Sequence, residues 1–176
     1  MINKTYQIDY SDWFDEGGYC QVYPIKNNPK LVFKEFYNKK RAIKALSNQK
    51  KLAKFDLAPE VYTSVCKLKF AKDENVLYHP VSDWGYVTEF AKTFKANTGI
   101  SMMQIQRLVD DILNKTGLKF WDCHWYNIGM VKRNNKKHIV CIDTGSESFE
   151  GHSNAWGYST PGPKCCYCYK YECKCG

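Results

Sequence analysis

The stretch WDCHWYNIG at residues 121–129, followed by IDTG at residues 142–145, decides the fold of this chain. Asp122 and Asn127 are separated by four residues, and Asp143 begins an Asp-x-Gly turn. Three oxygen-bearing side chains in this order suit phosphoryl transfer. One Asp orients the attacking hydroxyl and accepts its proton, and the Asn and the second Asp hold Mg²⁺. Taken alone, the pattern is more typical of a polar loop followed by a strand and an Asp-x-Gly turn, because short motifs match by chance.

Four further patterns precede this stretch in a fixed order. Residues 14–23 (FDEGGYCQVY) predict a turn between two strands, where Gly17 and Gly18 allow the backbone to approach phosphates closely. The next strand pattern, LVFKEF, carries Lys34. A helix pattern follows, and residues 86–91 (YVTEFA) predict a further strand that ends in an acidic segment. The order of these patterns carries more information than any one of them.

The ordered set resembles the protein-kinase-like superfamily over roughly residues 10–150. With His124 two residues after Asp122, the loop is more similar to aminoglycoside phosphotransferases and related atypical kinases than to eukaryotic protein kinases. The resemblance implies an α+β, bilobal kinase-like fold with ATP and Mg²⁺ as cofactors. It makes Asp122 and His124 catalytic and Asn127 and Asp143 the Mg²⁺ ligands, although His124 is equally typical of a packing histidine.

The resemblance also places the ATP contacts. The glycines cover the phosphates, the strand lysine binds them, a valine lies over the base, and the hinge bonds adenine through its backbone. These residues are Gly17, Gly18, Val22, Lys34, Glu89 and Ala91.

Two departures weaken the resemblance. Gln49 stands where a kinase helix supplies the Glu that pairs with the strand lysine, because residues 36–55 hold no acidic residue. Asp15 and Cys20 occupy positions where glycines usually lie in the phosphate loop. These departures leave open a weak enzyme, an unusual metal arrangement or a pseudokinase.

The chain divides by composition into three parts. Residues 1–92 predict a β-rich N-terminal lobe with one helix, and residues 93–150 a reduced C-terminal lobe with the catalytic and metal loops. Residues 151–176 predict a linker or activation segment and a Cys-rich tail. Since only 33 of the 176 residues follow Asp143, we expect a minimal or truncated C-terminal lobe, which would need a partner or a second copy to cover apolar surface.

Two helices are expected. Residues 39–55 predict one helix with Ile43, Leu46 and Phe55 facing inward. Residues 101–113 predict another, with Ser101 as N-cap, Gln104 three residues later and a continuous apolar stripe.

The net charge of +8 is concentrated. Residues 26–54 hold ten Lys or Arg and one acidic residue, Glu35. Such a surface could attract an acidic protein or, less readily, nucleic acid, but a solvated helix face is the simpler interpretation. The chain begins without an apolar signal segment and has no apolar run long enough for a membrane, so we expect a cytoplasmic protein, in the host cytoplasm if viral.

The C-terminal residues 164–176 hold five of the nine cysteines. Thiolates favour Zn²⁺, and His152 could add a ligand, but the spacing is not a paired C-x₂-C arrangement. A flexible thiol-rich tail is the alternative. The candidate zinc ligands are Cys165, Cys166, Cys168, Cys173 and Cys175.

The sequence therefore predicts an ATP- and Mg²⁺-dependent phosphotransferase that moves the γ-phosphate to a hydroxyl. The expected acceptor is a Ser, Thr or Tyr on a protein. Short Lys- and Tyr-rich chains of this kind are similar to phage or viral kinases. The alternatives are a pseudokinase that binds and inhibits a partner, a small-molecule kinase, and a nucleotidyl transferase on the same scaffold.

Overall fold

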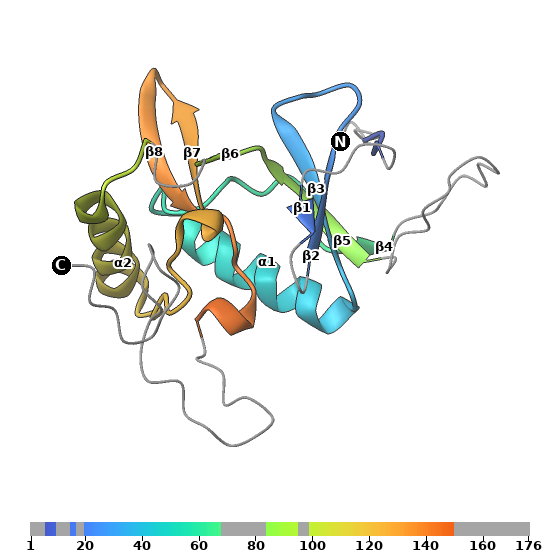
Figure 1. Ribbon diagram of the computed structural model, residues 1–176. Coiled ribbons are helices and arrows are strands. Elements are labelled where there is room, and N and C mark those ends of the chain that lie inside the picture. The colour runs from blue at the N-terminus through green and yellow to red at the C-terminus, as the bar shows by residue number, and fades with distance from the viewer. Residues whose placement is uncertain (1–5, 10–14, 17–19, 68–83, 95–98, 150–176) are drawn as a thin grey trace. The chain divides into compact units, whose positions relative to one another are not determined.

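The computed structural model describes residues 6–9, 15–16, 20–67, 84–94 and 99–149 (Figure 1). In these residues the chain is mixed α+β, with two α-helices and two antiparallel sheets, so the expected α+β class is confirmed. The chain forms two compact units. Unit 1 comprises Met1–Ser47 and Glu60–Phe90, and unit 2 comprises Asn48–Pro59 and Ala91–Gly176. The second unit thus includes residues 48–59, which the composition had placed in the first part.

Unit 1 contains a five-stranded antiparallel sheet of order β1-β2-β3-β5-β4. The pairing of β1 with β2 forms the hairpin expected around the glycine turn, but Gly17 and Gly18 themselves lie outside the described residues. The LVFKEF strand is confirmed residue for residue as β3. The strands are β1 (Asp15–Glu16), β2 (Cys20–Pro24), β3 (Leu31–Phe36), β4 (Cys66–Lys67) and β5 (Trp84–Glu89).

Both faces of this sheet carry a buried cluster, and successive side chains along a strand contribute to opposite faces. One face holds Phe33, Val87 and their neighbours. The other face holds Phe36 and Tyr86, whose rings stack at 5.6 Å, together with the first part of helix α1 (Lys39–Ala53). Lys34 pairs in register with Tyr86, so it lies on the face that α1 covers.

Asn38 caps the start of α1, because its Oδ1 accepts a 2.9 Å hydrogen bond from the Arg41 N–H. At the other end Asp56 adopts φ 59°, and the Leu57 N–H donates to the Leu52 carbonyl at 3.2 Å. This is a Schellman-type ending with Asp in the left-handed position that Gly usually takes.

The expected inner face of α1 is partly wrong. Leu46 is buried, but Ile43 and Phe55 are 50% and 44% exposed. The inward positions are filled instead by small and amide side chains, which carry no hydrophobic signal in the sequence. They are Ala42, Ala45, Asn48 and Gln49, with Leu52.

Unit 2 contains helix α2 and a three-stranded antiparallel sheet of order β6-β7-β8. The buried face of α2 packs in a cluster with Ile128 and Cys141 of the hairpin and with Leu52 and Leu57 from residues 48–59. The elements are β6 (Lys92–Thr93), α2 (Met102–Thr116), η1 (Trp125–Asn127), β7 (Ile128–Arg133), β8 (Lys136–Cys141) and η2 (Ser146–Ser148).

The capping box of α2 is confirmed. The Ser101 hydroxyl accepts from the Gln104 N–H, and the Gln104 side chain accepts from the Ser101 N–H. The helix continues to Thr116, beyond its expected end, and Gly117 stops it with φ 71°. Within the described part of the chain, no helix is long and apolar enough to cross a membrane.

Candidate functional site

The loop after α2 leads from Phe120 to the start of β7 and is fixed to the segment that follows β8. The Trp121 N–H donates a 2.9 Å hydrogen bond to the Ser148 carbonyl. The ring of Phe120 stacks on that of Phe149 with centroids 5.5 Å apart. Residues on both sides of the β7–β8 hairpin are therefore held together at its base.

Within this loop, Asn127 holds Asp122. The Asn127 Nδ2 donates to the main-chain carbonyl of Asp122 and to its Oδ2, each at 3.0 Å. Since both hydrogens of the amide group point to oxygens of Asp122, the amide Oδ1 of Asn127 is turned away from Asp122. An amide oxygen in this position is a suitable ligand for a hard cation.

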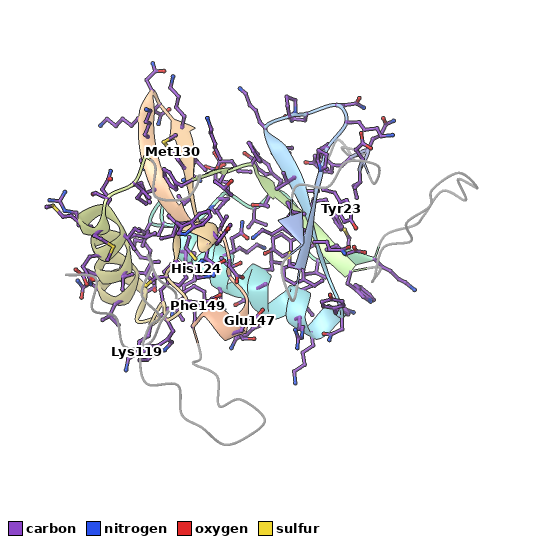
Figure 2. All side chains as sticks on the ribbon, in the orientation of Figure 1. Tyr23, Lys119, His124, Met130, Glu147 and Phe149 are labelled. Atoms are coloured by element: carbon purple, nitrogen blue, oxygen red, sulfur yellow. The ribbon has the colours of Figure 1, made fainter. Side chains whose placement is uncertain are left out.

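The side chain of His124 lies beside the carboxylate of Asp122 and is more deeply buried. Its side chain is 6% exposed, against 36% for that of Asp122, and its Nε2 is 3.5 Å from Asp122 Oδ1. Its ring meets that of Tyr126 edge-on. Figure 2 shows His124 at the base of the hairpin, whereas Met130 lies further along β7. The burial of His124 favours ordering of the loop, and Asp122 keeps an accessible side.

Asp143 begins the turn after β8. Its Oδ1 accepts from the Gly145 N–H at 3.1 Å, and its Oδ2 accepts from the Ser148 hydroxyl at 2.8 Å. Its carbonyl accepts from the Cys141 thiol at 3.0 Å. A carboxylate oxygen has more than one lone pair, so these bonds orient the group without preventing metal coordination.

The hairpin brings the two loops together. Ile128, the first residue of β7, pairs with Cys141, the last residue of β8. One step further, the Ile142 N–H donates to the Asn127 carbonyl at 2.9 Å. Asn127 therefore immediately precedes β7 and Asp143 follows β8 by two residues, at the same end of the hairpin.

The candidate ligands are the amide oxygen of Asn127 and the carboxylate of Asp143. The carboxylate of Asp122 lies in the same loop as Asn127. Mg²⁺ is typically bound by one or two carboxylates with the remaining positions filled by water and phosphate oxygens. The part of the chain that the structure describes holds no group of three His, Cys, Asp or Glu placed for a metal ion. The candidate zinc ligands, Cys165 to Cys175, lie outside the described residues.

The residue after Asp143 is tied to the end of α1. The Thr144 carbonyl accepts from Asn48 Nδ2 at 3.2 Å, and the Thr144 hydroxyl donates to Gln49 Oε1 at 3.4 Å. The Gln49 Nε2 donates to the Pro59 carbonyl at 2.9 Å. Gln49, expected as a partner of Lys34, thus uses both ends of its amide within unit 2.

The candidate ATP contacts that are described lie mainly in unit 1. Lys34 is 7% exposed on β3, opposite Val22 of β2. Glu89 ends β5, with its N–H bonded to the Glu60 carbonyl at 2.8 Å. Ala91 is the first residue of the second segment of unit 2, where it packs on Val131 and Val140. The expected hinge therefore coincides with the passage of the chain from one unit to the other.

Ser148 is the site residue that sequence reasoning missed. It is fully buried, donates to Asp143 and accepts from Trp121. No motif marks a serine five residues after an Asp-x-Gly turn. Strand β7 was also missed, although Asn134 and Asn135, at φ 48° and 61°, are the residues that a two-residue hairpin turn of type I′ favours.

Neither the protein-family models nor the curated proteins that were compared with this chain gave a match.

Proposed function

We propose that the chain is an ATP- and Mg²⁺-dependent phosphotransferase of the protein-kinase-like superfamily. The observation that carries the proposal is the double hydrogen bond from Asn127 Nδ2 to Asp122. It fixes the proposed hydroxyl-orienting carboxylate and turns the Asn127 oxygen outward as a metal ligand. A polar loop with no catalytic role would need neither a fixed Asp122 carboxylate nor an outward-facing Asn127 oxygen.

The order of elements supports the same proposal. A glycine hairpin, a lysine strand and a helix precede α2, the Asp122 loop, a hairpin and the Asp143 turn. Catalysis of phosphoryl transfer consists mainly of positioning and electrostatic stabilisation. In this proposal Asp122 accepts the proton of the acceptor hydroxyl, while Asn127 and Asp143 would hold Mg²⁺, which neutralises charge on the phosphates. His124 orders the loop, and Lys34 contacts the α- and β-phosphates.

The acceptor is proposed to be a hydroxyl on a protein. The experiment must distinguish this proposal from two alternatives, a small-molecule acceptor and the transfer of a nucleotidyl group.

The test is transfer of label from γ-labelled ATP with Mg²⁺, in the presence and absence of cell lysate. Asp122→Ala and Asp143→Asn should each abolish transfer. Asp110→Asn, an exposed carboxylate on α2, is the matched control and should leave transfer unchanged. Label from α-labelled ATP would instead indicate nucleotidyl transfer, and equal transfer by all variants would refute the assignment of the site.

A pseudokinase is the second candidate, and Gln49 favours it. The buried amide is bonded to Pro59 and Thr144, and residues 36–55 supply no carboxylate for Lys34. A folded wild-type protein that binds ATP without transferring either label would support this alternative.

A further inference from the structure

The tip of the β7–β8 hairpin, residues 132–137, is strongly basic. Its sequence, KRNNKK, holds four Lys or Arg and no carboxylate. Asn134 and Asn135 form the turn, with φ 48° and 61°. Figure 1 shows this turn at the end of the hairpin that is remote from η1. The whole hairpin belongs to unit 2, so the basic tip lies within one compact unit.

The strand register places like charges opposite each other at two successive positions of the tip. Lys132 pairs with Lys137, and Arg133 pairs with Lys136. The Cβ atoms of directly opposite residues lie about 5 Å apart, and like charges at such positions destabilise a sheet. The hairpin therefore keeps these charges although they oppose its own stability.

One of the four charges is compensated within unit 2. Arg133 forms an ion pair with Asp56 and donates to the Ala58 carbonyl at 3.1 Å. The other three residues are exposed lysines that form no ion pair with a described residue, so their positive charge is available to a partner. They are Lys132, Lys136 and Lys137.

Lys92 of β6 extends the charge over one face of the three-stranded sheet. It pairs with Met130, which lies two residues before Lys132 and therefore on the same face. Lys137 shares this face, because it lies directly opposite Lys132. Lys92 is exposed and likewise forms no ion pair with a described residue. Three lysines from three strands thus lie on one face, with Cβ atoms of neighbours about 5–8 Å apart.

The composition of the tip indicates the kind of partner. Protein–protein interfaces are enriched in aromatic residues and depleted in Lys, and residues 132–137 contain Lys but no aromatic or other apolar residue. Phosphate groups of nucleic acids, in contrast, are bound by Lys, Arg and Asn side chains. The tip therefore matches a phosphate backbone better than it matches a protein surface.

The shape of the tip indicates a duplex with a wide groove. Beyond Met130, β8 is the only described strand that pairs with β7, so the tip is a two-stranded ribbon. The major groove of B-DNA, about 12 Å wide, admits such a ribbon. The deep, narrow major groove of an RNA duplex does not. Both strands of the tip can therefore approach the phosphates of a DNA duplex.

Protection of an open strand edge is the simpler explanation for charged residues on a ribbon, because they prevent pairing with another chain. A mixture of acidic and basic residues would serve this purpose and would also give attraction between the two strands. Both residue pairs nearest the turn are instead entirely basic. Edge protection thus does not account for the sign of the charge.

We propose that the tip of the β7–β8 hairpin, together with Lys92, binds duplex DNA through its phosphate groups. The lysines contact the phosphates, and the Asn134–Asn135 turn enters the major groove. This interaction goes beyond the proposed phosphotransferase activity and does not depend on it.

The test variant changes the three lysines of the tip together to Gln, which removes their charge and keeps a polar side chain of similar length. A second variant changes the same three lysines to Arg, which keeps the charge. The residues changed in both variants are Lys132, Lys136 and Lys137.

A matched control removes the same charge from another exposed surface of unit 2. It changes to Gln three exposed lysines at the end of α1, which are Lys50, Lys51 and Lys54. The probes are a labelled DNA duplex of about 20 base pairs, an RNA duplex of the same length, and polyglutamate of similar charge. Fluorescence anisotropy over a series of salt concentrations gives the dissociation constants.

The Gln variant of the tip should bind the DNA duplex about tenfold or more weakly than the wild type at low salt. Its plot of log affinity against log salt should be shallower by about 2–3, because each lost phosphate contact removes about 0.9 from the slope. The Arg variant and the α1 control should bind within about threefold of the wild type. The unfolding temperature of the Gln variant should equal or exceed that of the wild type, because repulsion between the strands is relieved.

Four results would each overturn the proposal. They are absence of DNA binding by the wild type, unchanged DNA binding by the Gln variant, an equal loss in the α1 control, and binding of the RNA duplex or polyglutamate as tight as that of the DNA.

Discussion

Asn127 donates both hydrogens of its side-chain amide to Asp122, one to the main-chain carbonyl and one to Oδ2, each over 3.0 Å. One side chain therefore fixes both the backbone and the carboxylate of the proposed catalytic residue. The Asn127 carbonyl is in turn bonded to the Ile142 N–H, next to Asp143. The backbone carbonyl of Asn127 is therefore the bond that joins its loop to the segment of Asp143.

Asn127→Asp should abolish phosphoryl transfer and destabilise the protein. The substitution replaces the donor by a carboxylate within hydrogen-bond distance of Asp122, so attraction becomes repulsion. We expect a loss of about 1–3 kcal/mol in the free energy of unfolding, measured by urea denaturation. Tyr126→Phe, which changes a neighbouring residue that is 52% exposed, should leave stability unchanged. An Asn127→Asp protein as stable as the wild type would contradict the observed hydrogen bonds.

Ser148→Ala should weaken the use of Mg²⁺ more than it weakens folding. The hydroxyl orients Asp143 Oδ2 at 2.8 Å, while the Ser148 backbone bonds to Trp121 and Gly145 do not need the side chain. We expect the Mg²⁺ concentration for half-maximal activity to rise by up to about tenfold, which corresponds to about 1.4 kcal/mol. Ser146→Ala in the same 3₁₀ turn is the control. An unchanged Mg²⁺ dependence in an active Ser148→Ala enzyme would show that the hydroxyl does not position the carboxylate.

Burial raises the pKa of the Cys66 thiol above its usual value, and a backbone hydrogen bond opposes this only in part. The folded state therefore favours the neutral thiol. Its contribution to stability is complete below the ordinary thiol pKa and is lost as the pH rises through the ordinary value toward the raised one. Cys66→Ala should flatten the fall in the free energy of unfolding between about pH 8 and pH 10. Identical pH profiles for the two proteins would exclude this contribution.

Local sequence patterns predicted strands and caps better than they predicted which residues of a helix are buried. Strand β3 and the cap of α2 are read correctly because alternation and capping are local properties. The Asn127 side chain is bonded to Asp122, and the β7–β8 hairpin brings the segment that contains Asp143 beside that of Asn127. The inward face of α1 was misjudged because its buried residues include alanines and two amides, whose burial depends on tertiary contacts.

Ser148 and Thr144 illustrate what could not be predicted from sequence. Each has a buried hydroxyl whose partner is distant along the chain or comes from a turn without a recognised motif. Small polar residues are common in loops, so their roles emerge only when the partners are placed. The sequence indicates which residues could take part in catalysis. The structure adds the residues that orient them through hydrogen bonds, such as Ser148.

Gln49→Glu tests whether the missing carboxylate can simply be restored. Gln49 is fully buried, and its Nε2 donates to the Pro59 carbonyl at 2.9 Å. A carboxylate at this position has no hydrogen to donate and would face the carbonyl oxygen. Burial and repulsion should raise the pKa of the introduced carboxyl, which would be neutralised as the pH falls. We therefore expect a loss of about 1–3 kcal/mol in the free energy of unfolding at pH 7, with a smaller loss near pH 5.

The same variant separates the two candidate functions. If Lys34 needs a carboxylate partner and the helix can supply one from position 49, Gln49→Glu should increase ATP affinity despite its lower stability. If the amide is required where it is, both ATP affinity and stability should fall, because the bond to the Pro59 carbonyl is lost and a charge is buried in its place. Gln49→Met, which fills a similar volume without charge, measures the loss of the hydrogen bonds alone. The structure favours the second outcome, since both ends of the Gln49 amide are already bonded within unit 2. A gain in ATP affinity for Gln49→Glu over both wild type and Gln49→Met would overturn that expectation and favour an enzyme with a weakened lysine pair.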